Sequence, residues 1–141
     1  MRKQGAISAT ADVTVPFHDV DVAGVVWHGH YAKYLENARW VLMDRIDFGL
    51  NAMMGSGYLW PVVSLQVKYV RAARYGDRLR VQASLVDWES RLEINYLILD
   101  CKDDARVARA QTVQVAVEKE TGTLQFASPA CLVDRVRASL P

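Results

Sequence analysis

One stretch of the chain, Asp21-Val22-Ala23-Gly24-Val25-Val26-Trp27-His28, leads directly into a segment of helical periodicity that begins at Tyr31. It places a carboxylate, a glycine-containing apolar turn and a histidine immediately before a predicted helix. The first N–H groups of a helix have no intrahelical acceptor, and the helix dipole favours negative charge there. An acid or base beside such donors is suited to attack on a carbonyl group.

The predicted helix covers residues 31–48, where apolar side chains recur at the spacing of one helical face. Gly49 is expected to end it, because glycine readily adopts the left-handed conformation found just after helices. Upstream, residues 13–17 alternate between apolar and other side chains, which predicts a strand. Residues 1–9 are expected to be frayed, and residues 51–57 to form a loop.

The rest of the chain has the alternation that is typical of strands. The predicted strands lie at residues 63–69, 79–85, 92–98 and 107–117, with a hairpin turn at 119–122 and a partly helical tail at 129–140. Their connections are too short for parallel crossovers, so the sheet must be antiparallel. We therefore expect a single α+β domain over residues 1–141, with one long sheet wrapped around one helix. One helix covers only one face and leaves edges unpaired, which predicts a homodimer, with a dimer of dimers as the larger assembly.

Composition limits the class of protein. About half of the 141 residues are apolar (51%), and the formal net charge is +1. This balance argues against nucleic acid as a partner, and no apolar run is long enough to insert into a membrane. Cys101 and Cys131 are expected to be reduced thiols of a soluble cytoplasmic protein.

Asp21 and His28 are the candidate catalytic residues. Asp21 could activate water as a general base or attack an acyl carbon itself, and the His28 ring could assist. The backbone N–H groups of His28, Gly29 and His30 are candidate donors to a developing oxyanion. Asp19 is expected to point away from Asp21 and to have a structural or solvated role.

Two further clusters carry weaker signals. His28 and His30 with the nearby aspartates resemble a metal-ligand set, but the two rings need not converge, so no metal is expected. Lys68, Arg71 and Arg74 form a basic stretch at a strand end. Such a stretch is usually a solvated face, although it could bind the phosphates of a nucleotide carrier.

Three segments resemble a known family. They are FHDVDVAGVVWHGHY (17–31), YLENAR (34–39) and VRAARYGD (70–77). The pattern is similar to that of the hotdog-fold acyl-CoA thioesterases, in particular the hydroxybenzoyl-CoA thioesterase type, which includes the thioesterase encoded with the Tol-Pal system. The similarity covers roughly residues 12–127.

The resemblance implies a hotdog fold and hydrolysis of acyl-CoA or acyl-carrier-protein thioesters without metal or redox cofactors. It implies that Asp21 is the catalytic carboxylate and that the His28 N–H polarises the thioester carbonyl. It also implies an active site at a dimer interface. The chain departs from the pattern at Phe17, Trp27 and His30, where relatives often have a hydroxyl-bearing residue, Tyr or Phe, and Asn or Ser. Because of these differences, the resemblance does not indicate which acyl group the substrate carries.

Two other functions are compatible with the same fold. A hotdog dehydratase or hydratase would need a histidine and a second acid placed for proton transfer at adjacent carbons. A non-catalytic acyl-binding protein would bind thioesters without releasing a thiol.

Overall fold

The computed structural model describes residues 5–141. Five strands form one sheet in the order β1-β4-β5-β6-β3, and every neighbouring pair is antiparallel. The strands are β1 (Ile7–Thr14), β3 (Val62–Tyr69), β4 (Arg78–Asp87), β5 (Leu92–Asp100) and β6 (Arg106–Gln114). A second, small sheet pairs β2 (Tyr58–Leu59) with β7 (Val117–Glu118).

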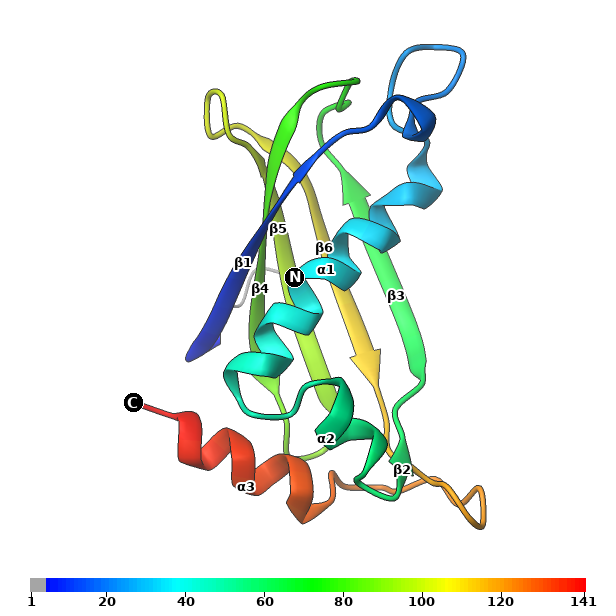
Figure 1. Cartoon of the computed structure of the whole chain (residues 1–141), viewed down its shortest axis with the longest axis vertical. Coiled ribbons are helices and arrows are strands. Elements are labelled where there is room, and N and C mark those ends of the chain that lie inside the picture. Colours follow the sequence, from blue (N-terminus) through cyan, green and yellow to red (C-terminus); the bar gives the residue numbers. More distant parts are fainter. Residues whose placement is uncertain (1–4) are drawn as a thin grey trace.

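The longest helix, α1 (Tyr31–Arg45), runs obliquely across one face of the large sheet (Figure 1). Successive side chains of a strand point to opposite faces, so only alternate residues meet the helix. The fully or almost fully buried side chains of this layer include Leu92, Ile94, Tyr96 and Ile98 in β5 and Leu35, Ala38 and Leu42 in α1. Each buried Leu or Ile contributes about 1.5–3 kcal/mol. The expected antiparallel sheet packed on one main helix is therefore confirmed.

The start of the chain differs from the prediction. Strand β1 begins at Ile7 and pairs with β4, so the expectation of fraying is wrong for residues 7–9. The part of that expectation on residues 1–4 lies outside the described residues. The predicted strand at 13–17 stops at Thr14, because Pro16 has no N–H for the ladder. Phe17 opens the 3-10 helix η1 (Phe17–Asp19) and is exposed.

The end of α1 also differs. The helix stops at Arg45, and the left-handed position is taken by Asp47 at a φ of 56°. Asp tolerates this conformation better than most residues with a Cβ. Gly49 is extended (φ −69°, ψ −171°) and precedes α2 (Leu50–Met54), which occupies part of the predicted loop. The prediction that Gly49 ends the helix is therefore wrong.

The C-terminal helix α3 (Ala130–Ser139) confirms the predicted helical tail. It packs at the end of the molecule away from the N-terminus of α1 (Figure 1). Leu132 and Val136 are fully buried there, and the Arg135 guanidinium lies 5.3 Å from the centre of the Phe48 ring. No helix in the described part of the chain is long and apolar enough to cross a membrane.

Strand β3 is an edge of the large sheet and pairs only with β6. No residue of β3 is fully buried. Its exposed large apolar side chains are Val62, Val63, Leu65 and Tyr69, and Val70 follows directly. An exposed apolar edge of this kind is a ready site for pairing with another chain.

Candidate active site

A tight hairpin connects η1 to the start of α1. Val20 and Val26 form an antiparallel bridge, and the Asp21 N–H donates to the Val25 carbonyl at 2.9 Å. Gly24, at a φ of 80°, donates its N–H to the Asp21 carbonyl at 2.9 Å. That φ favours glycine, which explains this residue in the middle of the apolar turn. The hairpin projects beyond the N-terminal end of α1 (Figure 1).

Asp21 lies at the base of this turn and is exposed in the single protomer. Its Oδ1 accepts the Ala23 N–H at 2.9 Å, which is the local bond of an Asx turn. The carboxylate is therefore held by its own backbone on one oxygen and is open to solvent.

The 3-10 helix η2 (His28–His30) leads directly into α1. The His30 N–H already donates to the Trp27 carbonyl at 3.0 Å, so it is occupied within the turn. The N–H groups of His28 and Gly29 come before this first bond and have no acceptor within the helix. Of the three predicted backbone donors, His28 and Gly29 are therefore the ones that the local geometry favours.

The Trp27 indole organises this turn. Its ring centre lies 5.0 Å from that of His28 and 5.3 Å from that of His30. A Cβ at Gly29 would lie 2.3 Å from the same ring, so only glycine fits there without moving Trp27. His30 makes no side-chain cap on α1. Within residues 5–141, no group of three or more His, Cys, Asp or Glu side chains is arranged to hold a metal ion.

A cleft of about 240 Å³ opens beside the start of α1. It is lined by Val26, His28, Tyr31, Tyr69, Val70, Arg71 and Ala72. The structure thus brings His28 together with the end of β3, whereas Asp21 lies outside this lining. Small-molecule sites usually enclose about 300–1,000 Å³. The cleft of one protomer is therefore smaller than a complete site.

Asp19 is the buried carboxylate of this region. Its side chain has no exposed area, and it accepts hydrogen bonds from Tyr34 Oη at 2.6 Å and Lys33 Nζ at 2.7 Å. His30 Nδ1 lies 3.8 Å from the same carboxylate. The Asp19 carbonyl also accepts the Trp27 N–H at 3.0 Å. Asp19 therefore ties the hairpin to the first turns of α1, and of its two expected roles the structural one is correct.

The charge of Asp19 is compensated. Burial acts to raise the pKa of this carboxyl, but hydrogen bonds from Lys33 and Tyr34 and the charge of Lys33 lower the pKa below its usual value. Conversely, burial and the neighbouring carboxylate raise the pKa of the Tyr34 hydroxyl. Asp19 thus stays ionised near neutral pH and Tyr34 stays a donor.

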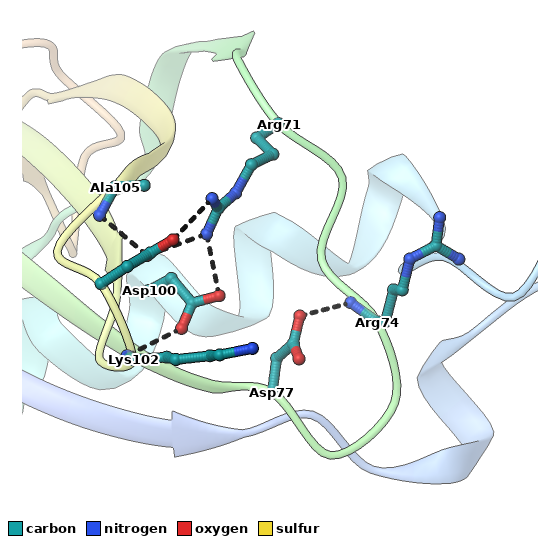
Figure 2. Close-up of polar contacts among 7 residues, drawn as sticks. Arg71, Arg74, Asp77, Asp100, Lys102 and Ala105 are labelled. Carbon is teal, nitrogen blue, oxygen red and sulfur yellow. Dashed lines mark hydrogen bonds and ion pairs between the residues drawn. The ribbon is translucent and has the colours of Figure 1, made fainter.

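The three predicted phosphate-binding residues fall into two groups. Arg71 donates to Asp103 at 2.9 Å and to Asp100 at 3.0 Å, so its charge is already paired. In Figure 2 the Arg74 guanidinium points away from this cluster. Among the described residues, neither Lys68 nor Arg74 has an ion pair, and Arg74 Nη1 lies 3.8 Å from the position of a Cβ on Gly24. Arg74 is therefore an unpaired cation beside the Asp21 hairpin.

Tyr69 is a residue of this region that the sequence does not reveal. Its hydroxyl donates to the His28 carbonyl at 2.8 Å, across 41 positions of sequence. For Tyr34 and Lys33, the sequence predicts only a place in the helix and not their hydrogen bonds to Asp19. The spacing of Tyr31 and Tyr34 on one helical face, next to an upstream aspartate, is the only signal that could have suggested the Asp19 cluster.

Comparison with known proteins agrees with this architecture. The family model of the thioesterase-like superfamily matches residues 15–140. The 1,4-dihydroxy-2-naphthoyl-CoA hydrolase of Thermosynechococcus vestitus is 29% identical over 107 residues, which cover 74% of this chain and 73% of that protein. The acyl-CoA thioester hydrolase YbgC of Escherichia coli O157:H7 is 32% identical over 73 residues, which cover 52% of this chain and 54% of that protein.

Solved structures show the same fold. The crystal structure of a 1,4-dihydroxy-2-naphthoyl-CoA thioesterase from Synechocystis superimposes with a TM-score of 0.81 at 22% identity, covering 92% of this chain and 96% of that one. The family match spans nearly the whole chain, and the sheet and its central helix coincide with those of a thioesterase. The chain therefore belongs to the thioesterase-like superfamily and has the hotdog fold.

Proposed function

We propose that the protein hydrolyses an acyl thioester of coenzyme A or acyl carrier protein to a carboxylic acid and a free thiol. The observation that carries this proposal is the cleft at the start of α1, where the His28 side chain lies next to N–H groups that have no acceptor within the helix and next to the Asp21 hairpin. The relatives named above, one a CoA hydrolase and one an acyl-CoA thioester hydrolase, support the same reaction class.

In the proposed reaction, the thioester oxygen is placed at the N–H groups of His28 and Gly29. Asp21 accepts a proton from water as the water oxygen bonds to the acyl carbon, or it attacks that carbon itself. The resulting oxyanion is stabilised by donors that are already oriented. The C–S bond then breaks, and the thiolate takes the proton that Asp21 received from water, with the help of the His28 ring. If Asp21 itself attacks, departure of the thiolate leaves a mixed anhydride, and water then hydrolyses this anhydride, regenerates Asp21 and supplies the proton. This sequence uses no metal or redox cofactor.

The partner subunit of a homodimer is proposed to complete the site. The cleft lies at the end of edge strand β3, and Asp21 is exposed rather than enclosed. Pairing of β3 with the β3 of a second copy would cover Val62, Val63 and Leu65 and would join the two sheets. The same contact would close the cleft and separate the reacting thioester and its attacking water from bulk solvent.

Carrier phosphates are proposed to bind Arg74, with Lys68 as a second cation. Among residues 5–141 Arg74 has no ion-pair partner, and its Nη1 lies beside Gly24 of the Asp21 hairpin. Arg71 also lines the cleft, but its ion pairs with Asp100 and Asp103 neutralise its guanidinium and weaken its attraction for a phosphate.

A dimer of dimers is proposed to form through the outer face of the sheet. The strand register aligns uncharged polar side chains there in one row, which consists of Ser8, Ser84, Asn95, Gln111 and Gln66. Light scattering that gave only a dimer mass at micromolar concentration would contradict this assembly.

The free thiols Cys101 and Cys131 support a location in the reducing cytoplasm.

The test is release of a free thiol from benzoyl-CoA, hexanoyl-CoA and acetyl-CoA. Asp21→Asn should lower kcat by about 10²–10⁴-fold, because it removes the acid–base group and keeps the Asx turn. Asp134→Asn, an exposed carboxylate on α3, is the matched control and should have wild-type turnover. Full turnover by Asp21→Asn on every thioester would refute the role of Asp21. Hydration of crotonyl-CoA without thiol release would point to a hydratase.

A further inference from the structure

Tyr69 joins the edge strand β3 to the start of α1. It is the last residue of β3, and its hydroxyl donates to the His28 carbonyl at 2.8 Å. Its ring packs edge-on against Tyr31, with ring centres 5.1 Å apart, and lies 6.5 Å from the His28 ring. All three side chains line the cleft. Tyr69 takes no part in the proposed bond-making and bond-breaking steps.

The Tyr69 hydroxyl donates its hydrogen bond to the peptide unit that joins His28 and Gly29. The His28 carbonyl and the Gly29 N–H belong to the same planar group, and no cis peptide bond occurs in the described chain. In a trans peptide these two groups point in opposite directions. The Gly29 N–H therefore points away from the Tyr69 hydroxyl. The N–H groups of a first helical turn also point out of the N-terminal end, the end beyond which the hairpin projects (Figure 1).

The preceding peptide unit is held in a similar way. The Trp27 carbonyl accepts the His30 N–H at 3.0 Å, and this unit carries the His28 N–H. The two peptide units that carry the candidate N–H donors thus both have their carbonyl oxygens hydrogen-bonded. One carbonyl accepts from a backbone N–H and the other from the Tyr69 hydroxyl. A hydrogen bond to a carbonyl also polarises its peptide and strengthens the attached donor, by about 10–30% per bond.

We propose that Tyr69 is a positioning residue of the thioester site, which orients and polarises the His28–Gly29 peptide so that the Gly29 N–H can stabilise the oxyanion. This inference rests on the proposed thioesterase function. Because Tyr69 lies on the edge strand, the side chain that prepares the donor also lies where a second subunit is proposed to dock.

Tyr69→Phe tests this role, because it keeps the ring contacts and removes only the hydroxyl. Loss of a complete oxyanion donor costs about 10²–10³-fold in kcat. Here the donor remains but is less constrained, so kcat for benzoyl-CoA and hexanoyl-CoA should fall about 10-fold. The KM should change by less than about twofold, because the Gly29 N–H acts mainly as negative charge develops on the thioester oxygen in the transition state. Tyr58→Phe, which removes a hydroxyl from β2, is the matched control and should leave kcat unchanged.

A spectroscopic measurement separates positioning from a general structural effect. Benzoyl-CoA bound to the Asp21→Asn protein should show a thioester carbonyl stretch shifted to lower frequency. The shift should be smaller when Tyr69→Phe is added, and unchanged when Tyr58→Phe is added. Circular dichroism of each variant checks that the fold is retained, and the infrared comparison then needs no turnover.

The outcomes distinguish the two levels of the proposal. Wild-type kcat in Tyr69→Phe, or an unaltered carbonyl shift, would overturn the role of Tyr69 and leave the thioesterase function intact. A rise in KM at constant kcat would make Tyr69 a substrate contact and would also overturn it. Absence of thiol release by the wild-type protein from all the CoA esters would instead remove the proposed function.

Discussion

Asp19 offers the sharpest test of how the site is built. The substitution Asp19→Ala removes the carboxylate that accepts from Tyr34 and Lys33 at 2.6 and 2.7 Å. It leaves the Tyr34 hydroxyl without this partner in a side chain that is only 2% exposed. The Lys33 side chain is 52% exposed and can turn to water. The cost should therefore come mainly from Tyr34.

The expected loss of unfolding free energy follows from these two contacts. A hydrogen bond to a charged group contributes about 1.5–3 kcal/mol, and an unsatisfied buried group costs about 1–3 kcal/mol. The half-exposed Lys33 pair adds no more than about 1 kcal/mol. Asp19→Ala should therefore destabilise the protein by about 2–4 kcal/mol, out of a typical total of about 5–15 kcal/mol. Asp19→Asn keeps an acceptor and should lose less, about 1–2 kcal/mol.

The assay is urea unfolding followed by tryptophan fluorescence at one fixed protomer concentration, because assembly would couple to stability. The dependence on pH gives an independent signature. Since the folded pKa of Asp19 lies below its unfolded value of about 3.9, its stabilisation is present above that pH. It is lost as pH falls through the folded pKa, so wild type and Asp19→Asn should converge at low pH.

Two results would refute this reasoning. One is an Asp19→Ala protein whose unfolding free energy is within about 0.5 kcal/mol of wild type, the range of ordinary surface substitutions. The other is a difference between wild type and Asp19→Asn that grows as pH falls below about 4. Tyr34→Phe should reproduce most of the loss, about 1.5–3 kcal/mol.

Arg74→Gln should raise KM for benzoyl-CoA about 5-fold, an effect of the size expected for one charge contact, and should leave KM for benzoyl-N-acetylcysteamine, which has no phosphates, unchanged. Equal effects on both esters would rule out phosphate binding by Arg74. Gly29→Ala should push its Cβ against the Trp27 ring, costing about 1 kcal/mol of stability because that ring is half exposed, and should shift Trp27 fluorescence; an unchanged emission spectrum would argue against this contact. Leu65→Glu on β3 should raise the dimer dissociation constant at least 10-fold in sedimentation, whereas Leu124→Glu, at the same exposed fraction of 47%, should not. Equal dissociation of both variants would argue against the β3 edge as the interface.

Local patterns in the sequence were enough for the elements and their arrangement. Apolar periodicity located α1 and the long strands, because each pattern depends on neighbours within a few residues. The short connections required antiparallel pairing, and the 17–31 motif identified the family. The Asp21 turn was also predictable, since Gly24 at a positive φ follows from the sequence of the hairpin itself.

The environment of each polar side chain was decided only by the tertiary structure. Arg71 meets Asp100 and Asp103 across 29 and 32 positions, and this pairing changes it from a candidate ligand contact to an intrachain cation. Tyr69 reaches His28 across 41 positions, which no local spacing encodes. The end of helix α1 was also missed, because the left-handed position after its last turn is taken by Asp47 rather than by the nearby glycine. Periodicity records which face of an element is apolar, whereas partners across the sheet depend on strand order and register, which only the packed chain fixes.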